Sequence, residues 1–172
     1  MSSQDNLVAI ADVRGDGELM AFIDAANAQL AALGYTEHGR RHAGLVGSIA
    51  EDILLQLGYP ERQAHLAHIA GYLHDVGNLV HREFHSLSGA MIAYHALRRL
   101  GMPPSEVATV MGAIGNHEED RGVPVSPVAA AVVLADKADV HRSRVQNADV
   151  EAFDNLDRVN YAVTHSALRV AS

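Results

Sequence analysis

The chain has 172 residues, and 48% of them are apolar, which is enough to build one hydrophobic core. A net charge of −8 argues against a broad electrostatic surface for nucleic acid. The absence of cysteine excludes disulfides and thiolate metal sites, and the 11 histidines direct the search to nitrogen and oxygen ligands.

The composition does not change along the chain, so we predict a single domain over residues 1–172. Residues 1–5 lack the basic region and the apolar run of a signal peptide, and no apolar stretch reaches the roughly 20 residues that span a bilayer. We therefore expect a cytoplasmic protein with neither a membrane partner nor a nucleic-acid partner. The oligomeric state is left open, a homodimer included.

Six segments carry apolar residues at helical spacing, and short polar or glycine-containing stretches separate them. The predicted helices cover residues 17–33, about 36–57, 61–73, 86–100, 105–116 and 128–140. Ser105 is the predicted N-cap of the fifth helix. Residues 147–172 fit either a strand or a seventh helix. The prediction is an all-α bundle of six to seven helices, mostly antiparallel.

Histidines and an aspartate lie on the apolar faces of these predicted helices. Apolar residues follow His42 at spacings of 3, 4, 7 and 11, and His117 and Asp136 each follow apolar residues by three and four positions. A lone inward histidine is more often a hydrogen-bonded core residue. A buried aspartate, however, needs a partner, and several such groups from separate helices indicate a metal site.

The adjacent pair His74 and Asp75 stands at the end of an apolar helix. Neighbouring residues of a regular helix point about 100 degrees apart, so both can face one ion only where the helix bends or ends. Gly77 supplies such an ending. The periodicity does not choose between Asp136 and Asp139 as the aspartate of the site, because both lie on a similar face.

The order of these residues resembles the HD superfamily of metal-dependent phosphohydrolases. The stretches that carry the resemblance are H-G-R-R-H-A-G-L-V at 38–46, G-Y-L-H-D-V-G-N at 71–78, H-S-L-S-G-A at 85–90, A-I-G-N-H-E-E at 113–119 and L-A-D-K-A-D at 134–139. Other stretches are similar to those of uncharacterised bacterial HD proteins. The resemblance covers about residues 35–145 and implies an HD helical bundle, with residues 146–172 as a C-terminal segment.

The resemblance implies one metal ion held by His42, His74, Asp75 and Asp136. Family members with two further histidines hold two ions, and His85 and His117 occupy those positions. Asp75 would bridge the ions, and His74 and Asp75 are the candidate catalytic residues beside a metal-bound hydroxide. Such ligands accept Fe or Mn, and also Zn, Ni or Co. The implied cofactor is two divalent transition metals, with one metal as the alternative.

The predicted reaction is hydrolysis of a phosphate ester of a nucleotide or another small molecule. Candidate substrate-binding residues are Lys137, Arg142, Arg144, His38 and Glu118. Two other functions stay open, namely a mixed-valent di-iron oxygenase of HD fold and a non-catalytic domain that keeps metal for stability. One departure is Asn78, which stands where relatives often carry a lysine.

Overall fold

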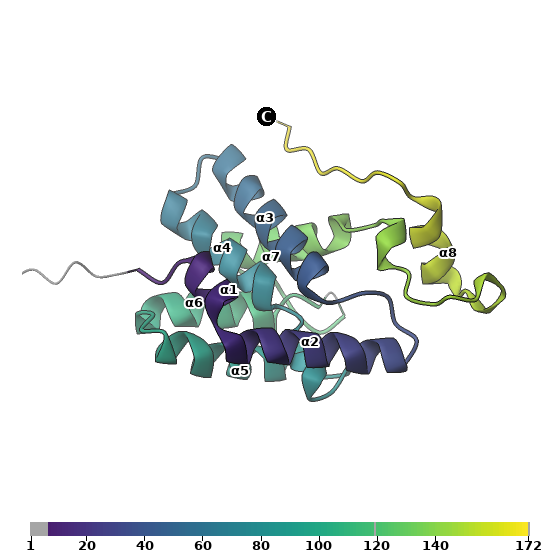
Figure 1. Ribbon diagram of the computed structural model, residues 1–172. Coiled ribbons are helices and arrows are strands. Elements are labelled where there is room, and N and C mark those ends of the chain that lie inside the picture. Colours follow the sequence, from purple (N-terminus) through teal and green to yellow (C-terminus); the bar gives the residue numbers. More distant parts are fainter. Residues whose placement is uncertain (1–6, 119, 172) are drawn as a thin grey trace, which may run out of the picture.

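Helices make up the regular structure of the protein, a computed structural model that describes residues 7–118 and 120–171 (Figure 1). The predicted all-α fold is confirmed, since no strand occurs in these two ranges. Within the same ranges, no helix is long and apolar enough to cross a membrane. The stretch that argued against a signal peptide, residues 1–5, lies outside the described residues.

The described residues form eight α-helices, one more than the upper prediction, and three 3-10 helices. The α-helices are α1 (Ile10–Gly15), α2 (Gly17–Ala32), α3 (Arg40–Gln56), α4 (Glu61–Leu73), α5 (His85–Arg99), α6 (Pro104–Gly115), α7 (Pro127–Ala138) and α8 (Asn155–Ala162). The 3-10 helices are η1 (Val76–Leu79), η2 (Arg142–Arg144) and η3 (Val150–Ala152). The limits of α4 agree with those predicted.

Three details of the helix prediction were wrong or open. The six-residue α1 was not predicted, because it is too short to show a helical period. Helix α6 begins one residue earlier than expected, with Pro103 rather than Ser105 at its N-cap. Between the two alternatives for the C-terminal segment, the structure forms a helix, α8, capped by the side chain of Asp154.

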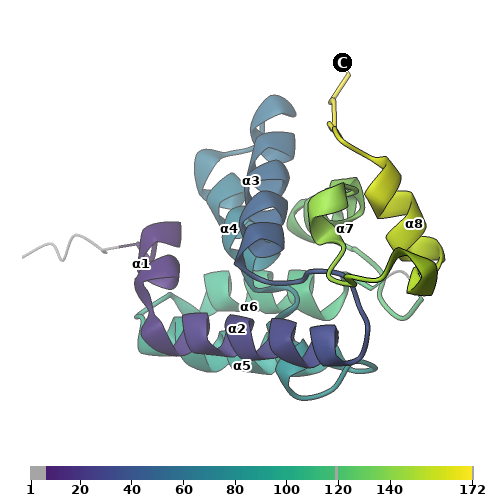
Figure 2. The same ribbon diagram turned by 45° about the vertical axis from the view of Figure 1, so that its right-hand side comes forward.

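The helices pack in pairs around one core. Helix α3 packs along α4, α5 packs along α6, and α7 contacts α3, α4 and α6. In both ribbon views α2, α5 and α6 lie below α3 and α4, whereas α8 lies at the side of the molecule, beyond α7 (Figures 1 and 2). The apolar faces of α2 to α7 supply most of the buried residues. These six helices therefore place their inward side chains around a common centre.

Two glycines allow α3 and α4 to approach closely. A Cβ atom added to Gly71 would lie 3.0 Å from the Cα and N atoms of Gly47 and 3.1 Å from the carbonyl carbon of Val46. These are backbone atoms, which cannot move aside as a flexible side chain can. This contact fixes the distance between the middle of α3 and the end of α4.

Substitution of Gly71 by alanine is expected to lower the free energy of unfolding by about 1–3 kcal/mol, because the added methyl group overpacks the contact between α3 and α4. The matched control is Gly112→Ala in α6, where an added Cβ meets no atom within 4 Å. That change is expected to stabilise by about 0.4–1 kcal/mol. Urea denaturation of both variants measures the difference, and equal midpoints would contradict the packing argument.

Candidate metal centre

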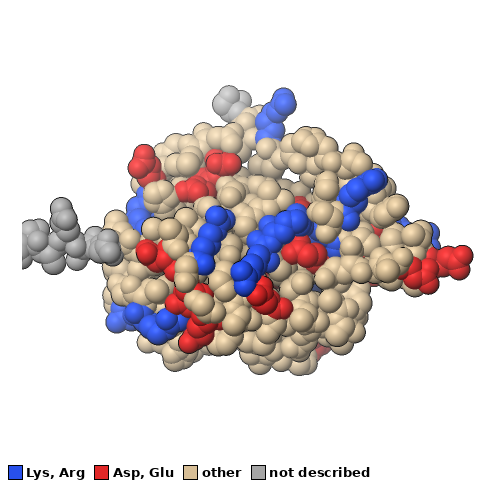
Figure 3. Space-filling model, in the orientation of Figure 1, with Lys and Arg blue, Asp and Glu red and all other residues tan. Residues whose placement is uncertain are grey.

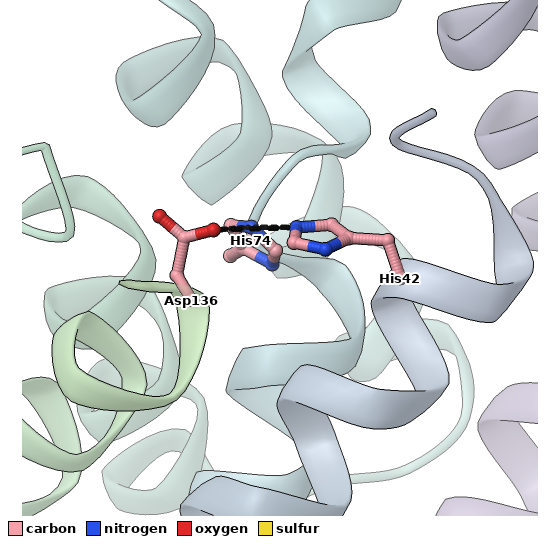
Figure 4. A group of neighbouring side chains, drawn as sticks. All are labelled: His42, His74 and Asp136. Atoms are coloured by element: carbon pink, nitrogen blue, oxygen red, sulfur yellow. Dashed lines mark hydrogen bonds and ion pairs between the residues drawn. The ribbon is translucent and has the colours of Figure 1, made fainter. Parts of the chain in front are cut away.

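The chain brings all six predicted ligands together. His42 lies in the first turn of α3, His74 and Asp75 follow the last residue of α4, and His85 begins α5. His117 follows α6, and Asp136 lies near the end of α7. Figure 4 shows the side chains of His42, His74 and Asp136 pointing toward one another. The four histidines and Asp75 are buried, whereas Asp136 keeps 17% of its side chain exposed.

One group of ligand atoms consists of His42, His74, Asp75 and Asp136. The Nε2 atom of His42 lies 3.3 Å from Nε2 of His74 and 3.3 Å from Oδ1 of Asp136. Oδ2 of Asp75 lies 3.2 Å from Nε2 of His74 and 3.6 Å from Nε2 of His42. Ligands bonded to one ion at about 2.1 Å are separated by about 3.0–3.4 Å in octahedral or tetrahedral geometry. These four residues therefore have the spacing of a metal site.

A second group surrounds the other oxygen of Asp75. The Nε2 atoms of His85 and His117 are 3.0 Å apart, and they lie 3.3 Å and 4.0 Å from Oδ1 of Asp75. His74, Asp75 and His117 also lie close enough for a common ion. We favour the pair His85 and His117 for the second group, because Nε2 of His74 already lies against Oδ2 of Asp75. Asp75 thus presents one oxygen to each group.

Each histidine of the cluster is held through its Nδ1 atom. Nδ1–H of His74 donates to the carbonyl of Gly71 (2.7 Å), and that of His117 donates to the carbonyl of Ile114 (2.7 Å). His85 donates in the same way to the carbonyl of Arg82 (2.8 Å). With Nδ1 protonated, the neutral ring carries its lone pair on Nε2, which is the atom that points into the cluster.

A buried oxygen without a partner supplies the test of whether a metal fits. Oδ2 of Asp75 is fully buried and has no hydrogen-bond partner among the described residues. An unpaired buried carboxylate oxygen costs several kcal/mol, and a cation removes that cost. The residues present therefore fit a metal: oxygen and nitrogen donors converge, and the unsatisfied Oδ2 of Asp75 is a ligand atom in the one-ion and in the two-ion arrangement.

The charges of the cluster also call for a cation. Burial would raise the pKa of Asp75 and of Asp136, but His74 and the other histidines outweigh this effect and hold both well below their usual range. Burial would lower the pKa of His74, yet Asp75 and Asp136 raise it to about 10. The two carboxylates thus favour positive charge beside Nε2 of His74, and a metal ion would supply that charge.

Residues 36–141 match the HD domain family, and this stretch contains all six residues of the cluster. The chain belongs to the HD domain family. An uncharacterised protein of Methanocaldococcus jannaschii is 28% identical to the chain, over 65% of the chain and 51% of its own length. The chain thus spans about half the length of that relative. No solved structure matches the chain significantly.

In this HD domain the structure separates Asp136 from Asp139. Asp136 points its Oδ1 at the Nε2 atoms, as a ligand would. Asp139 lies behind the cluster: its Oδ2 accepts from Nδ1–H of His42 (2.7 Å) and both of its oxygens accept from Arg41. Burial would raise the pKa of Asp139, but the hydrogen bonds from His42 and Arg41 keep it well below its ordinary value. Asp139 therefore orients His42 rather than facing an ion.

A cavity of about 370 Å³ opens onto the cluster and is lined by Asp75, His85, His117 and Asp136. Four of the predicted substrate-binding residues also line it, namely His38, Lys137, Arg144 and Glu118. Nζ of Lys137 lies 3.4 Å from Oδ2 of Asp136, and its side chain is half exposed. Of these four residues, only Lys137 is exposed, so its ammonium group can reach an anion in the cavity.

His38 and Arg144 line the cavity, but their polar atoms are already engaged. Nδ1–H of His38 donates to the carbonyl of Thr36, and Nε2 accepts from Nη2 of Arg144 (3.1 Å). Burial lowers the pKa of His38 to about 4, so the ring is neutral at pH 7. Arg144 also donates to the carbonyls of Glu37 and Asp139. Both residues hold the loop before α3 against the chain after α7.

Glu118 and Arg142 differ in their distance from the cluster. The carboxylate of Glu118 accepts from Oγ of Ser86 (3.0 Å) and lies 3.3 Å from Nδ1 of His85. Arg142 is exposed, donates to the carbonyl of Tyr161 and lies over the Tyr161 ring, and it does not line the cavity. The prediction that Arg142 holds phosphate therefore has no support in the structure.

Two residues that were not predicted as site residues, Asn78 and Arg82, form a chain of hydrogen bonds that begins at Asp75. Nδ2–H of Asn78 donates to Oδ1 of Asp75 (2.9 Å), and Oδ1 of Asn78 accepts from Nη1 of Arg82 (3.2 Å). The guanidinium of Arg82 lies over the ring of Tyr35 and lines the cavity. Two features of the sequence could have indicated these residues. One is the asparagine at position 78, where relatives often carry a lysine, and the other is an arginine three residues before His85.

Metal analysis of the purified protein is expected to give about two transition-metal ions per chain. His117→Ala is expected to leave about one, because His42, His74 and Asp136 remain and the second group loses a ligand. Elemental analysis by mass spectrometry after growth with Mn²⁺ or Fe²⁺ measures both. One ion per chain in the parent protein, retained in His117→Ala, would exclude the two-ion arrangement.

Asp139→Asn is expected to weaken metal binding about 10–100-fold, because His42 loses the carboxylate that fixes its ring and raises its basicity. Titration against a competing chelator gives the affinity. Asp52→Asn is the control, since Asp52 is an exposed residue of α3. An unchanged affinity in Asp139→Asn would show that Asp139 contributes nothing to the metal site.

Proposed function

We propose that this HD domain is a metal-dependent phosphohydrolase that cleaves phosphate esters of small molecules. The observation that carries the proposal is Asp75, whose two oxygens face two separate groups of ligands at the wall of an open cavity. A site that only stabilised the fold would be closed on all sides. Here the ligands Asp75, His85 and Asp136 are accessible from a cavity large enough for a small molecule.

The chain offers cations for the phosphate beside the proposed metals. Arg82 lines the cavity, and no carboxylate of the described residues lies within ion-pair distance of it. Lys137 directly follows the proposed ligand Asp136 in the sequence and also lines the cavity. A planar guanidinium can bind two phosphoryl oxygens at once, and its stacking on Tyr35 holds it in place. We assign Arg82 and Lys137 to the phosphate group.

Hydrolysis joins the oxygen of a water molecule to phosphorus and breaks the bond between phosphorus and the ester oxygen, which leaves as the alcohol with a proton. When bound, the ions would lower the pKa of water and offset charge on the phosphoryl group. Asp75 and Asp136 hold the charge needed to retain the ions, and Asn78 keeps the Asp75 carboxylate oriented. Glu118, at the cavity wall, is the candidate to give the proton to the alcohol.

The face of the molecule in Figure 3 carries isolated basic groups, most of them beside acidic ones, rather than one basic surface. This distribution and the net charge favour a small-molecule partner over nucleic acid. A cytoplasmic location and a homodimer stay predictions.

The Mn²⁺- or Fe²⁺-loaded protein is expected to hydrolyse an aryl phosphate, and Asp75→Ala is expected to reduce this to background by removing the shared ligand. Arg82→Gln is expected to raise KM about tenfold or more, because a charged hydrogen bond contributes about 1.5–3 kcal/mol. Steady-state kinetics with metal content measured on each variant tests both. The control is Arg98→Gln, an exposed arginine of α5 outside the cavity.

Two results would replace the proposal. Turnover that requires O₂, with a half-reduced di-iron signal, would assign the same ligands to a mixed-valent oxygenase. Full metal loading without hydrolysis of any nucleotide or sugar phosphate would indicate a non-catalytic, metal-stabilised domain.

A further inference from the structure

One wall of the cavity comes from a part of the chain outside the family match. Residues 36–141 match the HD domain, whereas Leu156 and Val159 of α8 line the same cavity as Asp75 and Asp136. Three positions apart on one helix, the two side chains lie on the same face of α8. The cavity therefore has a charged part at the ligands and an apolar part at α8.

The position of α8 is fixed by polar contacts with η2 and the residue before it. Oδ1 of Asn160 accepts from the backbone N–H of His141 (3.2 Å), and the backbone N–H of Arg142 donates to the carbonyl of Val163 (2.9 Å). Asp157 and Asn160 are buried, with 3% and 7% exposure. Helix α8 is thus attached to η2, the segment that follows the ligand helix α7, by its polar residues rather than by its leucine and valine.

The apolar side chains of α8 face the cavity instead of the core. Leu156 and Val159 are 61% and 55% exposed, so folding gains little from them. Tyr35, 39% exposed, adds an aromatic ring to the same cavity, with Arg82 over that ring. Small-molecule sites combine apolar walls with a few placed polar groups, and this cavity has that composition.

We propose that Leu156 and Val159 are specificity-determining residues that bind an apolar, planar group on the alcohol side of the phosphate ester. The inference rests on the proposed function in one respect: the phosphate end of the ligand must lie at the metal ligands with Arg82 and Lys137. The occupant of the α8 wall is then an aryl or similarly flat group joined to that phosphate. Esters of small polar alcohols would leave the wall exposed to water.

Binding of two phosphonates to the Mn²⁺-loaded protein tests the inference without turnover. Phenylphosphonate and methylphosphonate carry the same anionic head, joined by a carbon–phosphorus bond that ester hydrolysis does not break. Calorimetric titration is expected to give at least about tenfold tighter binding of phenylphosphonate. In the double variant Leu156→Asn, Val159→Thr this preference is expected to fall to about threefold or less, with the affinity for methylphosphonate unchanged.

The control is Leu55→Asn, an exposed leucine near the end of α3 and thirteen positions after His42. It should keep the full preference. Val159→Thr alone, which preserves side-chain shape, provides a second variant if the double variant unfolds, as circular dichroism would show. In that case a reduced preference in the single variant supports the inference and an unchanged preference overturns it.

The remaining outcomes separate the inference from the proposed function. Hydrolysis of esters without a preference for the phenyl group would overturn the inference and leave the proposed function standing. A preference for phenylphosphonate that depends on Leu156 and Val159, without hydrolysis of any ester, would do the reverse. A dimer that dissociates in the double variant, measured by light scattering, would assign the two side chains to self-association and overturn the inference.

Discussion

A buried carboxylate with two differently directed oxygens is the constraint on which the centre of the molecule depends. Asp75 cannot be satisfied by hydrogen bonds from the described residues, because Oδ2 has no partner. Its charge is retained in a buried position, and the cost of that burial is several kcal/mol unless a cation lies beside it. The start of α3, the end of α4, the start of α5 and the ends of α6 and α7 all bring a donor or an acceptor to this carboxylate or to its neighbours.

Helix ends do much of the positioning around Asp75. The last carbonyls of a helix have no partner within the helix, and here two of them accept from histidines of the cluster. The carbonyl of Gly71, near the end of α4, orients His74, and the carbonyl of Ile114, near the end of α6, orients His117. The same two hydrogen bonds satisfy the helix ends and turn each Nε2 inward. Fold and site are therefore built from the same contacts.

Space, rather than backbone conformation, explains Gly77. The sequence analysis took this glycine as a helix ending, and α4 does end at Leu73. A Cβ at Gly77, however, would lie 1.9 Å from the carbonyl oxygen of His85 and 2.4 Å from the backbone nitrogen of Gly89. The turn after Asp75 thus packs directly on the first turns of α5, and this close approach carries His85 to Oδ1 of Asp75.

A residue could be placed from the sequence where its direction follows from its own helix. It could not be placed where its role depends on the packing of two helices. Helical period identified the inward face of α3 and thereby His42, since a side chain's direction follows from its own helix. The choice between Asp136 and Asp139 depends on which side of His42 each carboxylate reaches, and that is set by the packing of α7 on α3. Likewise, Arg144 carries the charge expected of a residue that binds phosphate. Its guanidinium instead donates to the carbonyl of Glu37, more than a hundred positions away in the sequence.

The contacts of Arg144 also fix the segment that carries the α8 wall of the cavity. Arg144 joins the loop before α3 to the chain that follows Asp139, because it donates to Glu37 and Asp139 while the N–H of Glu37 donates to its carbonyl. The segment that carries α8 begins at this junction, so its path is fixed relative to His42 and Asp136. The exposed faces of Leu156 and Val159 make none of these contacts. Their side chains can therefore be exchanged without disturbing the six residues of the cluster.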